Sequence, residues 1–152
     1  IACKNADGTE QKILVKEVKE WYINDMHFVK IPTSSLSIGG SNEDIAIVKT
    51  PEDFKIKIYE TISQGIVGSG DPANYETIKD YVVLFPNAKK PKSISDLSFT
   101  PFKKVGKLLT DCPSLSEKVT NKTDGYKLGL ISSPQMILEM FLKIAVEYQD
   151  CK

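Results

Sequence analysis

The sequence predicts an α+β domain in which an antiparallel β-sheet, either open and curved or closed like a barrel, precedes three C-terminal helices packed on it. Two observations lead to this class. In Phe54–Ile62, apolar residues alternate with polar ones, a period of two that is typical of a strand with one buried face. In the segment from Pro134 to about Gln149, apolar residues cover a wide helical arc. The 152 residues fit one domain, with a β-rich part at 1–99 and a helical lid at 100–152.

The β-rich part is expected to begin with a hairpin. Asp7-Gly8 lies between two strand-like arms, Ile1–Asn5 and Glu10–Val15, and Asp-Gly is a strong hairpin signal. Asn24-Asp25 is a second turn that tolerates positive φ. The further strands expected in chain order are Val18–Ile23, Met26–Ile31, Asp44–Lys49, Phe54–Ile62 and Ile78–Phe85. We expect loops at Thr33–Asn42 and Ser63–Thr77, and a short extended segment at Ser93–Phe99.

Proline marks the start of each expected helix. Thr100-Pro101 combines an N-cap residue with proline at the first helical position, and Cys112-Pro113 and Ser133-Pro134 repeat this pattern. The first helix has an apolar face that includes Val105, Leu108 and Leu109. In the last helix the polar residues form one narrow stripe: Gln135, Glu139, Lys143 and Glu147. Such a wide apolar arc predicts burial against both the sheet and a neighbouring helix.

Three cysteines leave one unpaired if a disulfide forms, and Cys112 and Cys151 are the expected pair. Cys112 begins the middle helix and Cys151 follows the last one, so antiparallel packing would bring them together. Closing this loop of about 40 residues would stabilise the fold by about 4 kcal/mol on the chain-entropy model. A disulfide requires an oxidising compartment, which predicts an extracytoplasmic location.

The chain opens at Ile1 without a methionine, so we expect residues upstream. Ile1-Ala2-Cys3 is compatible with the end of a lipobox, which would make Cys3 a lipid anchor. The predicted hairpin argues against that alternative, because an anchor is normally followed by a flexible tether. The role of Cys3 therefore stays open.

Two motifs recur in a known group of proteins. One is the strand segment Asp53–Glu60 (DFKIKIYE). The other combines Pro101–Lys104 (PFKK) with Asp111–Pro113 (DCP), and is completed by Leu108-Leu109, Leu115, Lys118-Val119 and Cys151. From Phe54 onward the chain resembles secreted Bacteroidota proteins of unknown function. Tyr148 also fits, although Gln149 stands where that group has Asn. The resemblance implies an upstream signal peptide, export and a disulfide, but no activity.

Composition and motifs argue against several functional classes. Twenty lysines balance twenty acidic residues and there is no arginine, which disfavours nucleic acid as a partner. No apolar run has the length of a transmembrane segment. No metal-binding spacing occurs, so we expect neither metal nor cofactor. The Gly65–Gly70 segment lacks the lysine and the helix of a phosphate loop and is interpreted as a hairpin tip.

Candidate catalytic residues are few. His27 is the one histidine and lies on a predicted strand, where a structural role is favoured over that of a catalytic base. Cys112 at a helix start would be a nucleophile only if it were not in a disulfide. Acidic pairs at Glu43-Asp44 and Glu52-Asp53, together with Asp71, are interpreted as turn residues. A hydrolase using paired carboxylates from Glu43–Asp53 is the alternative.

Aromatic residues are the candidate ligand-binding groups. A platform for a sugar or a peptide would be formed by Trp21, Tyr22, Tyr59, Tyr75 and Tyr81. Tyr59, expected on the solvent side of its strand, and Tyr75, expected in a loop, are the better candidates, with Trp21 as the third. Lys89, Lys90 and Lys92 form a basic patch that is interpreted as a solvated turn. The expected function is a non-enzymatic binding or structural module of the cell envelope. Its partner would be another envelope macromolecule or a glycan, and a carbohydrate- or peptide-binding module is the second hypothesis.

Overall fold

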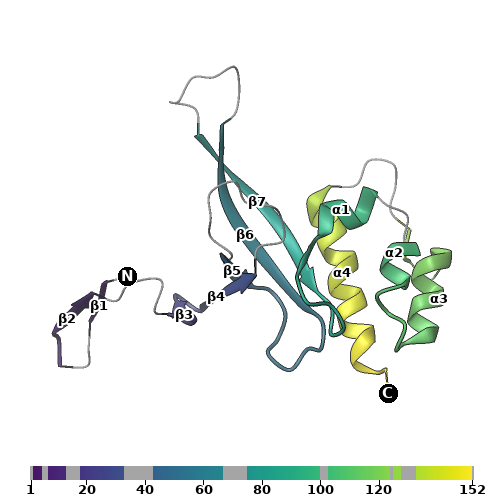
Figure 1. Cartoon of the computed structure of the whole chain (residues 1–152), viewed down its shortest axis with the longest axis horizontal. Coiled ribbons are helices and arrows are strands. Elements are labelled where there is room, and N and C mark those ends of the chain that lie inside the picture. The colour runs from purple at the N-terminus through teal and green to yellow at the C-terminus, as the bar shows by residue number, and fades with distance from the viewer. Residues whose placement is uncertain are drawn as a thin grey trace.

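The computed structural model describes residues 2–4, 7–12, 18–32, 43–66, 75–99, 103–123, 125–127 and 133–151. Its centre is a six-stranded antiparallel sheet followed by helices, so the predicted α+β class is confirmed (Figure 1). Strands that are neighbours in sequence are also neighbours in the sheet. In chain order they are β3 (Glu20–Ile23), β4 (Met26–Pro32), β5 (Glu43–Val48), β6 (Lys57–Ile66), β7 (Tyr75–Leu84) and β8 (Lys92–Ser93).

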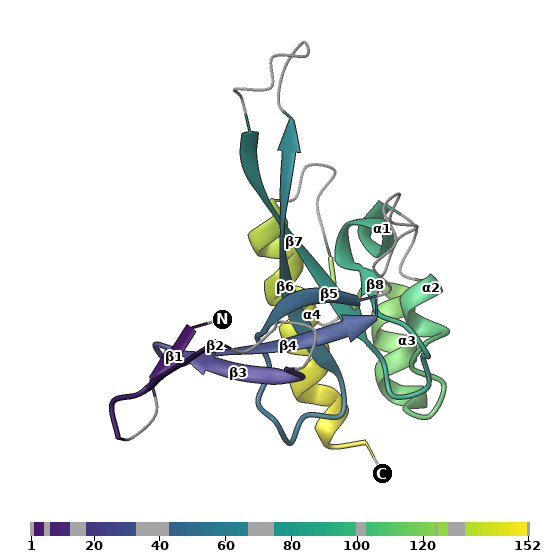
Figure 2. The ribbon, with the colours of Figure 1, turned by 60° about the vertical axis from the view of Figure 1, so that its left-hand side comes forward.

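The sheet is open and strongly twisted. β3 and β8 are its two edges, so the barrel alternative was wrong. In Figure 2, β3, β4 and β5 run across β6 and β7 at a steep angle. A separate two-stranded sheet pairs β1 (Ala2–Lys4) with β2 (Glu10–Lys12), and Gly8 in its turn has a φ of 84°. The predicted N-terminal hairpin is therefore confirmed.

The hairpin of β6 and β7 is longer than the sequence indicated. The predicted loop at Ser63–Thr77 was wrong at both ends, because β6 extends to Ile66 and β7 begins at Tyr75, which pairs with it. The β-branched residues Thr61, Ile62, Thr77 and Ile78 favour this extended conformation. Residues 67–74, which include most of Gly65–Gly70, lie outside the described part, as does the loop predicted at Thr33–Asn42.

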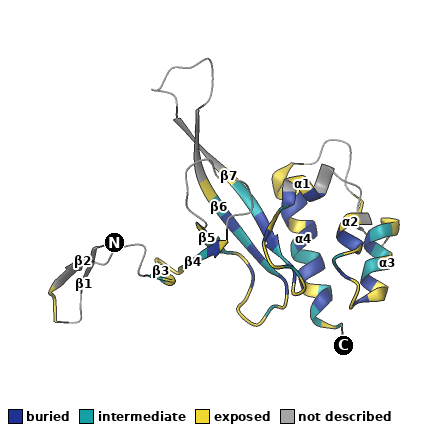
Figure 3. Ribbon diagram, viewed as in Figure 1, coloured by how far each residue is buried: buried dark blue, intermediate teal, exposed yellow. Residues whose placement is uncertain are grey.

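One face of the sheet carries the main core. Ile58 on β6 and Val83 on β7 pair across the strands, and both are fully buried against the helices. In Figure 3 the buried residues gather where β6 and β7 face α4 (Pro134–Gln149). Four positions beyond Ile58 on the same face, Ile62 is 49% exposed. Cover by the helices therefore decreases along β6 between Ile58 and Ile62.

The helices begin largely where proline predicted. Ser133 caps α4 by accepting a hydrogen bond from the backbone N–H of Met136, and Pro134 is its first residue. α3 (Pro113–Asn121) follows Cys112, and α2 spans Lys103–Gly106. α2 is shorter than predicted: the carbonyl of Gly106 accepts hydrogen bonds from the Ser116 hydroxyl and from the N–H of Leu109. These bonds occupy the Gly106 carbonyl, which in a longer α-helix would accept a hydrogen bond from the N–H four residues later.

A further helix, α1 (Ile94–Phe99), occupies the segment predicted to be extended, so that prediction was wrong. Ile94 and Leu97, three residues apart, are both buried in the main core. α1 contacts β7 and α4, while α3 contacts α4. Burial of one short helical face thus decided the conformation of this segment. Among the described helices, none has the length and apolarity to cross a membrane.

Cys112 and Cys151 form a disulfide, with Cα atoms 5.5 Å apart and a sequence separation of 39. The predicted pairing and its geometric basis are therefore confirmed, since the start of α3 meets the end of α4. α4 buries most of its predicted apolar arc, namely Ile137, Leu138, Met140, Phe141, Ile144, Ala145 and Tyr148. Met136 and Val146 are about half exposed, so the buried arc is narrower than expected.

Candidate functional site

The sheet face opposite the main core holds a cleft. Adjacent strand residues point to opposite faces, so Tyr59 and Val82 turn away from the helices that cover Ile58 and Val83. Val82 joins a small second core with Ile31 and Ala46, against which Tyr59 packs. A cavity of about 530 Å³, here called the His27 cleft, is lined by Lys19, Glu20, His27, Val29, Lys30, Ile31, Val48, Glu52, Lys57 and Tyr59.

The β3–β4 hairpin positions the first group of side chains. Asn24 and Asp25 have φ values of 48° and 63°, the left-handed conformation of a tight two-residue turn, which places Tyr22 directly opposite His27. The two rings stack with centroids 4.3 Å apart and planes 14° apart. On the same face, the Glu20 carboxylate lies 3.1 Å from Nε2 of His27.

A turn after β5 supplies the opposite wall of the cleft. Thr50 is buried and accepts a hydrogen bond from the N–H of Ile58, and Phe54 N–H donates to the carbonyl of Pro51. The ammonium of Lys57 donates to the carbonyls of Pro51 and Glu52. These bonds tie the turn to β6 and thereby position Glu52 at the cleft.

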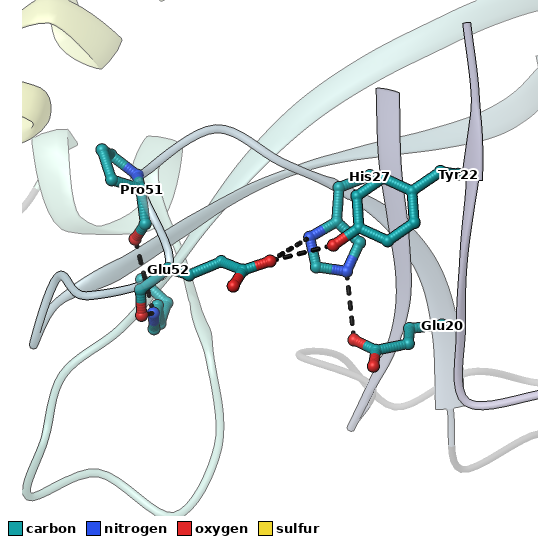
Figure 4. Close-up of polar contacts among 6 residues, drawn as sticks. Glu20, Tyr22, His27, Pro51 and Glu52 are labelled. Atoms are coloured by element: carbon teal, nitrogen blue, oxygen red, sulfur yellow. Dashed lines mark hydrogen bonds and ion pairs between the residues drawn. The ribbon is translucent and has the colours of Figure 1, made fainter. Parts of the chain in front are cut away.

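Glu52 completes the constellation around His27 (Figure 4). Its Oε1 accepts a hydrogen bond from the Tyr22 hydroxyl at 2.9 Å and lies 3.8 Å from Nδ1 of His27. The imidazole thus has a carboxylate at each nitrogen, Glu20 on one side and Glu52 on the other. The side chain of His27 is only 16% exposed, whereas those of Glu20 and Glu52 are 63% and 77% exposed. Both carboxylates therefore remain accessible to a ligand.

Both phenols of this region stay protonated at neutral pH. The hydrogen bond to Glu52 raises the pKa of Tyr22, and burial and the charges of Glu52 and Glu20 add to it. Burial raises the pKa of Tyr59. The lining of the cleft consequently offers the neutral hydroxyl of Tyr59 and the carboxylates of Glu20 and Glu52, with three lysines on its walls: Lys19, Lys30 and Lys57.

The three aromatic residues predicted to bind a ligand do not come together. Tyr59 lies in the cleft, half-buried rather than fully on the solvent side. Trp21 is on the opposite face of β3, where its ring stacks on Phe28 with centroids 5.5 Å apart. Tyr75 belongs to β7 and pairs with Ile66, seven positions along β6 from Tyr59, or about 23 Å. The side chain of Tyr75 lies outside the described part of the chain.

The predicted carboxylate pair is also separated. Glu43 and Asp44 begin β5, paired with Pro32 and Ile31, whereas Glu52 and Asp53 follow the other end of that strand. Glu52 lies at His27 instead, at the imidazole nitrogen opposite the one that Glu20 contacts. Asp71 lies outside the described residues. Within the ranges described above, no group of three or more His, Cys, Asp or Glu side chains is arranged to hold a metal ion.

Sequence reasoning missed Glu20 and undervalued His27. One signal was present: the Asn24-Asp25 turn fixes a register in which Tyr22 faces His27, and alternation then puts Glu20 on the same face. Glu52 belonged to the acidic residues of the hydrolase alternative, but no local signal indicated its contact with Tyr22, which spans 30 residues.

Comparison with known proteins gives no relative from which to transfer a role: the chain matches no protein-family model, no curated protein and no solved structure.

Proposed function

We propose that this protein is a non-enzymatic, exported binding module whose His27 cleft holds a carbohydrate. The proposal rests on the hydrogen-bonding groups that lie around the His27 imidazole, with the exposed carboxylates of Glu20 and Glu52 on either side of it. Sugar hydroxyl groups both donate and accept hydrogen bonds. Carboxylates are strong acceptors for them, because a hydrogen bond to an ionised group is stronger than one between neutral groups.

The size and composition of the cleft support a ligand of one or two sugar units. Its volume of about 530 Å³ lies within the range of small-molecule sites. Tyr59 and the apolar side chains Val29, Ile31 and Val48 provide a surface for the C–H groups of a pyranose ring. The polar groups on the walls would fix its orientation.

Pre-organisation also favours binding. Tyr22 stacks on His27 and donates to Glu52, so three of the side chains restrain one another before any ligand arrives. Less conformational entropy is lost on binding when the groups are already ordered. The Lys57 contacts to Pro51 and Glu52 extend this restraint to the backbone of the turn.

The extracytoplasmic location is part of the proposal and is supported by the Cys112–Cys151 disulfide. Disulfides persist in secreted and periplasmic proteins and are rare in reducing compartments. A cell-envelope glycan is the ligand source that agrees with this location.

A hydrolase is the second candidate, now with Glu20 and Glu52 as the paired carboxylates. It is favoured by one observation, the position of these two groups on opposite sides of the same imidazole. A hydrolase would release new reducing ends when the protein is incubated with an oligosaccharide that it binds, and this result distinguishes the two candidates. The binding-module proposal expects none.

Isothermal titration of the oxidised protein against neutral oligosaccharides of two to six units tests the proposal. For a sugar that binds, we expect Glu20→Gln and Glu52→Gln each to weaken affinity about tenfold or more, because a charge-assisted hydrogen bond is lost. Glu117→Gln is the matched control, since Glu117 is exposed on α3 and away from the cleft. If no neutral sugar binds, or if both cleft variants bind as the wild type does, the proposal is wrong.

A further inference from the structure

A second cavity, distinct from the His27 cleft, lies beside the helices. It has a volume of about 540 Å³ and is here called the lysine pocket. It is formed by the connection between β7 and β8, by α1, by α2 and by the residues just after α2. These segments gather at one side of the molecule in Figure 2. The lining residues are Ala88, Lys89, Lys90, Pro91, Lys92, Ser93, Asp96, Leu97, Lys104 and Leu108.

The pocket concentrates positive charge in a chain whose net charge is zero. It is lined by four lysines and by one acidic residue, Asp96. Three of the lysines come from the β7–β8 connection and β8, whereas Lys104 approaches from α2. The charges therefore come from two separate segments of the chain, a juxtaposition that the run Lys89–Lys92 alone did not predict.

The ammonium groups of these lysines have no polar partner among the described residues. All four are exposed, and none of their ammonium groups makes a hydrogen bond or ion pair with another described residue. Other lysines in the described part do so: Lys49 and Lys79 both pair with Glu60, and Lys118 pairs with Glu147. Four neighbouring like charges repel one another, so an anionic ligand would lower the electrostatic energy of this region.

The floor of the pocket limits the kind of anion. Pro91 and Leu97 are buried and Ala88 and Leu108 are partly buried, so the floor is aliphatic. No aromatic side chain lines the pocket, which removes the stacking platform typical of single-stranded nucleic-acid sites. Because these apolar groups are buried or partly buried, they are not available to insert into a bilayer. A chain of anionic sugar units satisfies these conditions, since its C–H faces can contact the floor and its charges the lysines.

We propose that the lysine pocket binds a segment of an acidic polysaccharide through carboxylate or sulfate groups. Lysine ammonium groups act as point charges without the planar fork of arginine, so recognition would depend on charge density and spacing more than on bidentate geometry. Binding should therefore weaken steeply as salt is added, because these exposed charges are screened.

Isothermal titration with two probes of equal length, a heparin hexasaccharide and a galacturonate hexamer, tests the proposal at two salt concentrations. We expect at least one probe to bind. We also expect Lys90→Gln/Lys104→Gln to weaken that binding about tenfold, at roughly 0.7 kcal/mol for each exposed charge. Lys107→Gln/Lys127→Gln is the control: it removes the same charge from exposed residues that do not line the pocket. Lys90→Arg/Lys104→Arg should keep most of the affinity.

Three results would overturn the proposal. The first is that neither hexasaccharide binds at low salt. The second is that the control pair weakens binding as much as the pocket pair does. The third is that anionic vesicles or oligo-dT bind with a dependence on Lys90 and Lys104 while both hexasaccharides do not. Lys90→Gln/Lys104→Gln should bind a neutral oligosaccharide of the His27 cleft as the wild type does, because neither lysine lines that cleft. Failure at this pocket is thereby separated from failure at the His27 cleft.

Discussion

The hydroxyl of Tyr148 donates a hydrogen bond to the carboxylate of Asp111, the residue that precedes Cys112. Tyr148 lies in the last turn of α4 and is 2% exposed, so this bond lies beside the disulfide at the edge of the main core. The start of α3 and the end of α4 are therefore connected twice, by the Cys112–Cys151 disulfide and by this hydrogen bond.

Replacing Tyr148 with phenylalanine should destabilise the protein by about 1–3 kcal/mol, because the Asp111 carboxylate loses a donor while the buried ring is kept. Urea unfolding of the oxidised protein measures the change in the free energy of unfolding. Tyr81→Phe is the control, since the Tyr81 hydroxyl makes no hydrogen bond within the described residues and the ring is only partly buried. Equal losses in the two variants would show that the Asp111 contact contributes nothing.

The same pair predicts a loss of stability in alkali. Burial, and then the hydrogen bond to Asp111 and its charge, raise the pKa of Tyr148 above its ordinary value of 10.0. The unfolded chain therefore releases this proton before the folded one does. The contribution is complete below pH 10 and is lost as the pH rises above that value. Unfolding free energies measured from pH 8 to 11 should fall less steeply in Tyr148→Phe than in the wild type, and parallel curves would contradict this.

Removing the disulfide should have a larger effect. The bond between Cys112 and Cys151 closes a loop with a separation of 39, for which the chain-entropy model gives about 4 kcal/mol. We expect Cys112→Ala/Cys151→Ala and the reduced wild type to lose similar amounts in urea unfolding. Peptide mapping without reductant should recover the two cysteines in one linked peptide. Free thiols at both positions in protein purified from an oxidising compartment would contradict the bond.

Glu60 should contribute to the way the free energy of unfolding depends on pH in acid. It is buried on β6, and its carboxylate contacts the ammonium groups of Lys49 at 3.2 Å and Lys79 at 3.3 Å. Burial alone raises its pKa, but the hydrogen bonds and charges of the two lysines outweigh burial and bring the pKa below 4.5. This contribution is present above pH 4.5 and is lost as the pH falls through the lowered pKa.

Substituting Glu60 with glutamine should therefore cost about 1–2 kcal/mol at pH 7, a value kept small because both lysines are partly exposed. The variant should also show a flatter pH dependence of stability below pH 4.5. Chemical unfolding at several pH values gives both quantities, with Glu117→Gln as the exposed control. If Glu60→Gln keeps the wild-type acid limb, the two lysines do not stabilise the ionised carboxylate.

Gly106 should tolerate no side chain. A methyl group there would clash with the Thr120 hydroxyl and approach the Ser116 carbonyl to 3.2 Å, because α2 packs directly on α3. Gly106→Ala should destabilise the protein by about 1–3 kcal/mol. Thr120→Ala removes the clashing atom, so the double variant should recover part of that loss. Additive losses in thermal unfolding would show that the clash is not the cause.

Local signals in the sequence were sufficient for much of the fold. The Asn24-Asp25 turn set the register of its hairpin, proline marked the starts of α3 and α4, and alternation placed Ile56 and Ile58 in the core. Local signals were insufficient where burial against the core decided the secondary structure of a segment. Ile94–Phe99 has no strong helix signal and is helical because Ile94 and Leu97 bury against the main core.

The candidate site divides in the same way. Tyr59 was a predicted ligand-binding residue and lies in the cleft. The pairing of Tyr22 with His27 follows from the Asn24-Asp25 turn between them, within six residues of sequence. The contact with Glu52 spans 30 residues and depends on the twist that carries β3 and β4 over the turn after β5. Likewise, Lys104 joins Lys89, Lys90 and Lys92 only because α2 packs beside the β7–β8 connection.

The sequence by itself determined the α+β class and the alternation that buries one sheet face, because both depend on local period and capping. It also indicated the cysteine pair, which further required α3 and α4 to pack antiparallel. Only the tertiary structure decided which polar side chains meet. Glu20, His27 and Glu52 come from two strands and a turn, and their distances depend on how far the sheet twists. Such twist is the sum of many small backbone rotations and of packing against the helices, and no single segment of the sequence encodes it.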